Sequence, residues 1–241
     1  MNRIAIGCIG ALSIVEASKS LNWSLYRTQW FKSINRTFRI HPTIITLTGI
    51  NLAVFAAWQA PILRHTMSKY FTCGVINPFS KPQPYHYVGW LFSTCSHQSL
   101  IHLGCNMLAF QSFAPILLSQ VDTPQFAQFF ICSAFLSSMA SLLYKRHYRI
   151  LNSSVGLSGV LMAMLAFTAL KYPQVKVNLM FIPIPFEIGT GMAAIVGLDI
   201  MGVLFRWNLF DHVAHLGGVL AGFLYFQYFK QRKTQKRINW R

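Results

Sequence analysis

The sequence predicts an all-α polytopic membrane protein, and three observations carry this prediction. Of its 241 residues, 54% are hydrophobic and only 11% are charged, whereas soluble domains usually carry about a quarter charged residues. Six stretches are mainly apolar over roughly the 20 residues that a helix needs to cross the hydrocarbon layer. Positive charge gathers outside them, with six of the 21 Lys and Arg before His41 and six after Phe229, as membrane proteins distribute it.

Each of the six stretches predicts one membrane helix. In chain order they are Thr43–Leu63, His97–Leu118, Phe126–Tyr144, Val155–Leu170, Phe186–Phe205 and Val213–Phe229. Pro183 and Pro185 break the chain before the fifth stretch, and the proline-rich residues Asn77–Pro84 are typical of a loop. The Ile4–Val15 run is short for a span. It would form a seventh helix if extended through Ser18, or else belong to a targeting segment.

The distribution of charge divides the chain into three parts. We expect a basic N-terminal segment over residues 1–40, a membrane domain over residues 41–230 and a basic tail over residues 231–241. The first part is basic and rich in Ser and Thr, with Glu16 as its only acid, which is typical of a mitochondrial transit peptide. Ordinary positive charge beside a membrane helix is the alternative. With six spans, the positive-inside bias places both tails on the cytosolic or matrix side.

Two protein classes do not fit the composition. A nucleic-acid surface would need basic residues along a soluble element with exposed aromatics, and none is found, so we expect the lipid bilayer and no nucleic acid as a partner. The five cysteines are odd in number and contain no CxxC pair, which argues against a disulfide framework or a zinc ribbon. We therefore expect buried structural thiols.

Ser158 is the first polar residue that is out of place in an apolar segment. It lies between Gly156 and Gly159 at the start of the fourth stretch. Glycine lets a substrate approach the backbone, and a helix N-terminus offers free N–H groups and a positive dipole end. Both features suit a nucleophile whose product is an oxyanion. The alternative is a serine that merely bonds to a carbonyl one turn earlier.

A stripe of small residues marks the sixth stretch. Ala214, Gly218 and Gly222 recur every four residues and share one helix face, which allows another helix backbone to come close. His215 lies beside this stripe. Because histidine is the usual base for a serine nucleophile, a close helix that carries Ser158 would give His215 its partner. The alternative is a hydrogen-bonded packing role for His215.

The second stretch contains another polar cluster. His102 and Asn106 are one turn apart and share a face, where they could donate to a developing oxyanion. His97 lies near the start of this helix and belongs to the cluster less directly; an interhelical polar clamp is the alternative. Two aspartates also stand out. We expect Asp211 to cap the sixth helix and Asp199 to make a buried polar contact, since its surroundings lack the Gly-x-Gly-Asp pattern of aspartic intramembrane proteases.

Together these residues resemble the rhomboid family of intramembrane serine proteases. The resemblance lies in three patterns that occur in the family's order, on the second, fourth and sixth helices: His97-x4-His102-x3-Asn106, Gly156-x-Ser158-Gly159 and Ala214-His215-x2-Gly218-x3-Gly222. The stretches SVGLSG and FDHVAHLGG are most similar to the mitochondrial branch, the presenilins-associated rhomboid-like proteases of the inner membrane. The basic N-terminal segment agrees with that branch.

The resemblance implies a six-helix rhomboid core, to which many members of the branch add one N-terminal helix. It implies a Ser–His dyad without cofactor or metal, in which Ser158 attacks and His215 transfers the proton. His102, Asn106 and the Ser158 backbone N–H would hold the oxyanion. The supporting residues would be His97, Gly156, Gly159, Gly218 and Gly222.

The resemblance also implies the setting of the reaction. The protein would be a multi-pass protein of the mitochondrial inner membrane. Its substrates would be single-span membrane proteins, such as the precursors of a dynamin-like GTPase or of cytochrome c peroxidase.

Two positions depart from the family's pattern, and three other functions compete with proteolysis. Val88-Gly89 stands where many rhomboids carry Trp-Arg, and Met162 stands where many carry Tyr; the role of His212 is open. The first alternative is a catalytically inactive rhomboid-like protein that binds and escorts membrane helices. The second is a zinc enzyme, although no HExxH pattern occurs. The third is a transporter, although no paired repeat is found.

Overall fold

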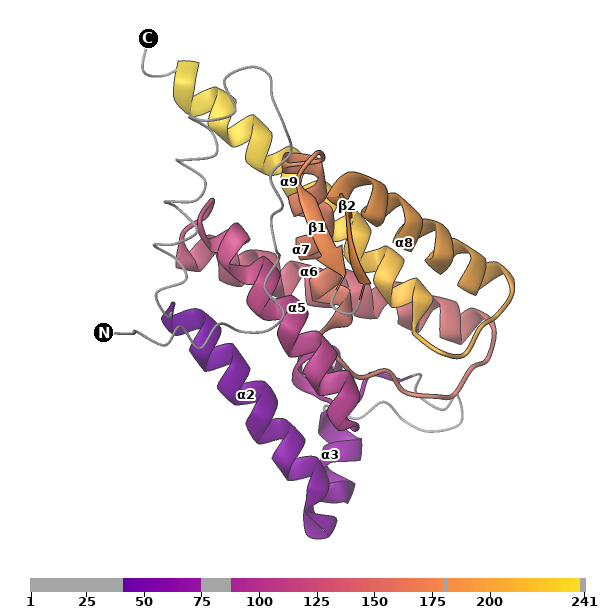
Figure 1. Ribbon diagram of the computed structural model, residues 1–241. Coiled ribbons are helices and arrows are strands. Elements are labelled where there is room, and N and C mark those ends of the chain that lie inside the picture. Colours follow the sequence, from indigo (N-terminus) through magenta and orange to yellow (C-terminus); the bar gives the residue numbers. More distant parts are fainter. Residues whose placement is uncertain (1–40, 75–87, 180–181, 239–241) are drawn as a thin grey trace.

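The computed structural model of the protein describes residues 41–74, 88–179 and 182–238. Within them the chain forms eight α-helices, two short 3₁₀ helices and one antiparallel pair of strands (Figure 1). The helices are α2 (Pro42–Gln59), η1 (Pro61–Leu63), α3 (Arg64–Tyr70), α4 (Gly89–Phe92), η3 (Ser93–Cys95), α5 (Leu100–Leu118), α6 (Thr123–His147), α7 (Ser158–Lys171), α8 (Ile188–Leu204) and α9 (His212–Ile238). The strands are β1 (Lys176–Leu179) and β2 (Ile182–Glu187). The expected segment over residues 1–40, including Ile4–Val15, and the expected loop Asn77–Pro84 lie outside the described residues.

Each of the six predicted segments lies mainly on one helix, namely α2, α5, α6, α7, α8 or α9, but the first, Thr43–Leu63, runs past the end of α2 into η1. Two helices begin about three residues later than predicted. α5 begins at Leu100 because the Ser99 side chain accepts a hydrogen bond from the backbone N–H of His102 and caps the helix. α9 continues to Ile238, so residues that we expected in a separate tail extend the last helix.

Proline ends the first span. α2 stops before Pro61, and the chain then bends by 98° into η1 and α3. By length and composition, α5 and α6 can each cross a membrane, and the bent pair that starts with α2 is a third candidate among the described residues. α7 and α8 are shorter apolar helices. The fold is therefore that of a multi-pass helical membrane protein.

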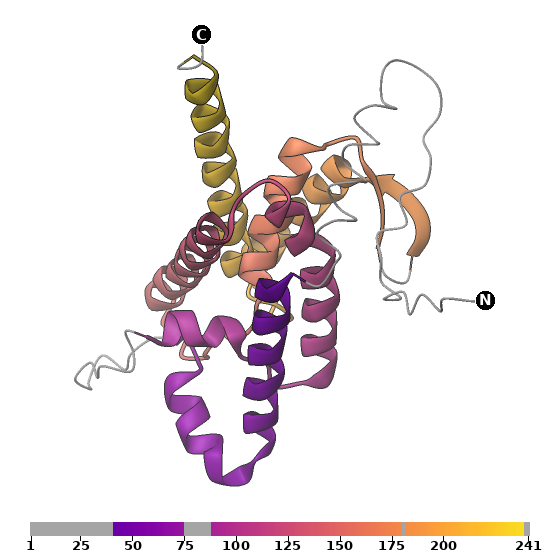
Figure 2. The same ribbon diagram turned by 90° about the vertical axis from the view of Figure 1, so that its left-hand side faces the viewer.

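α7 is the central helix of the bundle. Ten of its 14 residues are buried, because α5, α6, α8 and α9 all pack against it (Figures 1 and 2). The largest part of the core lies around this helix and includes Phe110, Phe129, Met164 and Phe167, each less than 2% exposed. At 1.5 Å per residue, α7 is about 21 Å long, less than the roughly 30 Å of the hydrocarbon layer. α7 alone is therefore too short to span that layer.

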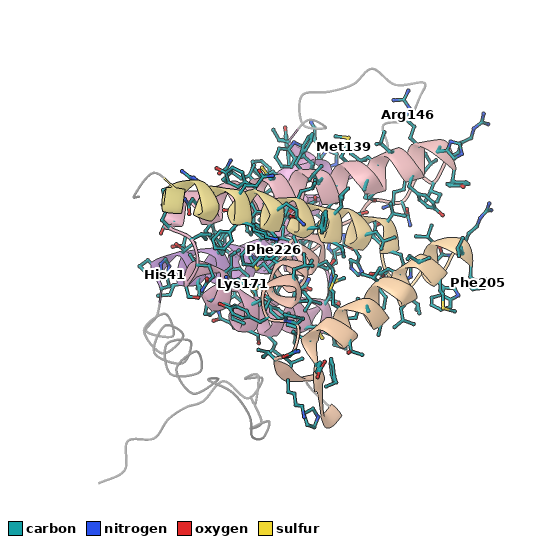
Figure 3. The ribbon with its side chains drawn as sticks, turned by 90° about the horizontal axis from the view of Figure 1, so that it is seen from above. His41, Met139, Arg146, Lys171, Phe205 and Phe226 are labelled. Carbon is teal, nitrogen blue, oxygen red and sulfur yellow. The ribbon has the colours of Figure 1, made fainter. Side chains whose placement is uncertain are left out.

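The helices alternate in direction, which brings several helix ends together on one side. In Figure 3, Arg146 near the end of α6 and Phe205 just after α8 lie on one side of the molecule, and His41 before α2 lies on the other. α9 starts on the side where α6 ends, because Lys145 pairs with Asp211, the residue before α9. The same lysine bonds to Ser154 in the loop that leads into α7. The starts of α7 and α9 therefore share one side.

Two features differ from the sequence-based expectations. Cys73 is buried, but Cys105 and Cys132 are exposed; the expectation of buried thiols is wrong for these two, because an apolar surrounding in a membrane bundle can be lipid. The hairpin β1–β2 was not predicted either. It pairs Lys176 with Glu187 and Val177 with Phe186 between α7 and α8.

Candidate active site

Ser158 is the first residue of α7. The residue before it, Leu157, makes no side-chain hydrogen bond that caps the helix, so the first backbone N–H groups of α7 have no partner from this side chain. Gly156 has a φ of +123°, which strongly favours glycine. A Cβ at Gly156 would also lie 2.6 Å from Cε1 of His102. Glycine is therefore needed here both for the turn and for the close approach to α5.

His102 and Asn106 of α5 face this turn, as their shared helix face predicts. The Asn106 side-chain nitrogen lies 3.4 Å from the position of a Cβ on Gly156. The same amide lies 2.7 Å from Nε2 of His97, which is fully buried before α5 begins. The ring of His97 packs edge-on against that of His102, with the centroids 4.9 Å apart. The three predicted residues therefore form one polar cluster beside the start of α7.

His97 joins this cluster to the loop before Ser158. Its Nε2 accepts a long hydrogen bond of 3.5 Å from the backbone N–H of Leu157 as well as the contact with Asn106. An atom that accepts from two donors carries no proton, so the proton of neutral His97 lies on Nδ1. His97 thus fixes the Asn106 amide and the residue before Ser158 at once, a closer role than its place outside α5 suggested.

Glycines bring the backbones of α7 and α9 into contact. A Cβ at Gly218 would lie 2.0 Å from the carbonyl oxygen of Gly159, and a Cβ at Gly222 would lie 2.3 Å from that of Ala163. The stripe of small residues on α9 therefore packs on α7, as its spacing predicts. A Cβ at Gly159, the residue after Ser158, would lie 3.5 Å from the carbonyl oxygen of Ala214, the residue before His215. The start of α7 and the start of α9 are neighbours.

His215 lies in the first turn of α9, and its side chain is 15% exposed. Its Nδ1 lies 3.1 Å from Oδ1 of Asp199 on α8. His212 approaches the same oxygen, with its Nδ1 2.7 Å away. The buried contact expected for Asp199 is thus real, and its partners are the two histidines of α9. Sequence reasoning missed this pairing, although a lone acid inside an apolar helix is itself a signal for a buried partner.

A small polar cavity of about 30 Å³ lies between Ser158 and α6. Most of the side chains around it are small or carry a hydroxyl. They include Ser93, Thr94, Ser137, Ser138, Ser141 and Ser154. This volume suffices for a water molecule, which also needs several polar partners.

Asp211 closes the cavity on the side of α9. Its Oδ1 accepts from the backbone N–H of Ala214 at 3.0 Å and caps α9 as predicted. Its Oδ2 accepts from Lys145 at 2.9 Å, from Ser141 at 2.5 Å and from Ser154. Burial alone would raise the pKa of Asp211, but Lys145 and the two hydroxyls outweigh it and hold this pKa below its ordinary value of 3.8. Asp211 therefore ties α6, the loop before α7 and α9 together.

The two positions that depart from the family's pattern have ordinary packing roles. Gly89 packs against the backbone at Thr72, since a Cβ on Gly89 would be 2.5 Å from the carbonyl oxygen of Thr72. Tryptophans anchor this region: the Trp58 indole N–H donates to Ser96 at 2.7 Å, and Ser138 donates to the carbonyl of Trp90. Met162 is buried in an apolar cluster with residues of α8. Within the described ranges, no group of three or more His, Cys, Asp or Glu could hold a metal ion.

Comparison with known proteins identifies the family. The model of the rhomboid domain matches residues 84–232, more than half of the chain. The chain belongs to the rhomboid family. This confirms the resemblance seen in the sequence, and the matched range contains the three patterns from His97 to Gly222.

The relatives of this rhomboid include mitochondrial proteins. It is 33% identical to presenilin-associated rhomboid-like protein A, mitochondrial, of Danio rerio, over 81% of this chain and 50% of the relative. It is 32% identical to the presenilin-associated rhomboid-like protein, mitochondrial, of Mus musculus, over 90% of this chain and 55% of the relative. It is 33% identical to rhomboid protein 1, mitochondrial, of Saccharomyces cerevisiae, over 83% and 58%. The chain thus spans about half the length of the relatives it matches.

Proposed function

We propose that this rhomboid is an intramembrane serine endopeptidase in which Ser158 is the nucleophile and His215 is the base. The observation that carries the proposal is the glycine contact between α7 and α9, where Gly218 leaves no room for a Cβ against Gly159. This contact holds the first turn of α9 beside the first residue of α7. A serine without a nearby base is a weak nucleophile, so the contact supports a paired role for the two side chains.

The proposed reaction has two steps. Ser158 Oγ attacks the carbonyl carbon of the substrate peptide, and its proton moves to Nε2 of His215. The C–N bond then breaks, and His215 returns the proton to the leaving amine. A water molecule next attacks the ester on Ser158, gives its proton to His215 and releases the new carboxyl end, while Ser158 recovers its proton. The polar cavity beside Ser158 can hold a water molecule for this step.

The oxyanion of each step would accept hydrogen bonds from the His102 ring, the Asn106 amide and the backbone N–H of Ser158. His102 and Asn106 lie at Gly156, two residues before the serine, which is the side on which the carbonyl oxygen would lie. Donors that are already in place stabilise developing charge strongly where water is excluded. Loss of one such donor typically lowers kcat about 100-fold to 1,000-fold.

The substrates that we propose are single-span membrane proteins, cleaved within or next to the membrane segment. α7 is too short to cross the hydrocarbon layer, so Ser158 would lie at a depth where a membrane helix can reach it. A helix hides its carbonyl groups, so a locally unstable segment would be cut. The mitochondrial relatives support the inner membrane as the location, with precursors of a dynamin-like GTPase or of cytochrome c peroxidase as candidate substrates. The membrane domain would be residues 41–230.

A fluorophosphonate probe and a single-span model substrate test the proposal on the purified protein in detergent. We expect labelling and cleavage by the parent and the loss of both in Ser158→Ala and His215→Ala. Ser119→Ala and His147→Ala, which change a serine and a histidine outside the cluster, are the matched controls and should keep both. A folded parent that neither labels nor cleaves would contradict the proposal. It would favour instead a rhomboid-like protein that binds and escorts membrane helices.

A further inference from the structure

Asp199 is shared by two histidines. Its Oδ1 lies 2.7 Å from Nδ1 of His212 and 3.1 Å from Nδ1 of His215. The aspartate is 4% exposed and His212 is 7% exposed, so neither group is free to turn toward bulk water. A buried carboxylate is costly unless it accepts hydrogen bonds. The two imidazole N–H groups supply them, and both come from the first turn of α9.

The fold makes room for this arrangement at Gly202 of α8. A Cβ there would lie 2.4 Å from Cδ2 of His212, so only a glycine lets the imidazole lie against α8 beside Asp199. The His212 ring also neighbours Trp207 and Phe210, with centroids 6.1 Å away in each case. The histidine is packed against α8 and these two rings, and its Nδ1 lies within hydrogen-bond distance of the carboxylate.

We propose that Asp199 and His212 are positioning residues for His215, an inference that rests on the proposed function of Ser158 and His215. Because Oδ1 of Asp199 only accepts, its contact keeps the proton of neutral His215 on Nδ1 and leaves Nε2 bare as the base. When Nε2 takes the proton of Ser158, Nδ1 keeps its own, and the carboxylate stabilises the imidazolium without taking a proton. His212 keeps the carboxylate turned toward His215 by donating to the same oxygen.

The catalytic unit would then contain more residues than a Ser–His dyad. The resemblance implied a dyad in which packing alone orients the base. Here the base on α9 would depend on an acid on α8 and on a second histidine one turn away. A purely structural ion pair would hold α8 against α9 but would have no effect on the reaction of folded protein. The two roles can therefore be separated by kinetics.

The decisive measurement is kcat and KM for cleavage of the model substrate by folded Asp199→Asn. We expect kcat to fall at least about tenfold, as loss of the acid does in soluble triads, with KM within about threefold of the parent. The rate of labelling by the fluorophosphonate probe should fall in parallel, because it also needs the base. Asp122→Asn, which changes the acid that caps α6 and accepts from the backbone N–H of Gln125, is the control and should keep kcat within about threefold of the parent.

Two substitutions of His212 keep the inference testable even where Asp199→Asn folds poorly. His212→Leu removes the second donor and should lower kcat. His212→Asn places an amide N–H where Nδ1 stood and should restore most of it. A folded Asp199→Asn or His212→Leu with the kcat of the parent would overturn the inference while leaving the proposed protease intact, and so would an equal loss in Asp122→Asn. A parent that is inactive and unlabelled would instead overturn the proposed function itself.

Discussion

Individual carboxylates matter for the structure of this chain, because it has only five acids against 21 Lys and Arg. Three of them are matched to specific donors. Asp122 caps α6 by accepting from the backbone N–H of Gln125, Asp199 accepts from two imidazoles, and Asp211 accepts from Lys145 and from the start of α9. Each of these three acids therefore holds a helix end or a site residue in place.

The ion pair of Lys145 and Asp211 gives the first prediction. Lys145→Met leaves a mostly buried carboxylate without its cation, so we expect it to lower the free energy of unfolding by about 3–5 kcal/mol. The double variant Lys145→Met with Asp211→Asn should recover part of this loss, because no charge is then left unpaired. Thermal unfolding in detergent measures both. Equal losses in the single and double variants would contradict the charge-based explanation.

The same ion pair predicts a dependence on pH. The pKa of Asp211 lies below its ordinary value of 3.8 in the folded protein, so its stabilising contribution is complete above 3.8 and is lost as the pH falls through the lower, folded value. Asp211→Asn removes that contribution at neutral pH. The gap in stability between parent and variant should therefore be constant near pH 7 and close below pH 3.8. A gap that widens in acid would contradict this prediction.

At the scale of helices and strands, the apolar stretches predicted where each span lies but not where it begins. The start of α7 depends on Gly156 and its positive φ, and the start of α5 depends on the Ser99 cap, two features that hydrophobicity does not record. The hairpin was missed because prolines argue against a strand. In β2, however, the residues that pair with β1 are Ile182, Phe186 and Glu187, which flank Pro183 and Pro185, so the prolines occupy no paired position.

The candidate site was predictable to a similar degree. Ser158, His102, Asn106 and His215 stand out as polar residues in apolar helices, and their spacing resembles a known family. The partner of Asp199 could not be predicted, because α8 and α9 meet only through three-dimensional packing. The spacing of residues along the chain does not indicate that two histidines in one turn of α9 contact one aspartate of α8.

The close contact between α7 and α9 predicts that a methyl group added at Gly218 destabilises the protein. Gly218→Ala would place a methyl group 2.0 Å from a backbone oxygen of Gly159, which cannot move aside as a side chain can. We expect a loss of about 3 kcal/mol in stability, at the upper end of overpacking effects, together with loss of probe labelling. Gly197→Ala in α8, where a Cβ meets nothing within 4 Å, is the control and should be neutral or stabilising. Equal effects of the two changes would show that the contact is not tight.

At the scale of the whole molecule, the proposed function requires that the bundle admit water to Ser158 within the membrane. Ser158→Cys, in a background without other cysteines, should therefore react with a charged, water-soluble thiol reagent in liposomes. Cys132, exposed on the long apolar helix α6, should face lipid and stay unreacted when it is the single cysteine. Reaction of Cys132 but not of the Ser158→Cys thiol would contradict the prediction that water reaches position 158 and that Cys132 faces lipid.

The site takes its groups from α5, α7, α8 and α9, with no two consecutive residues of the proposed catalytic set on the chain. Such a site cannot exist in a partly assembled bundle. A chain newly inserted in the membrane, with its helices still apart, would have no proteolytic power of its own. Under the proposed mechanism, Ser158 would react with a fluorophosphonate only after the last helix has packed. The labelled fraction of chains would therefore measure the fraction that has completed folding.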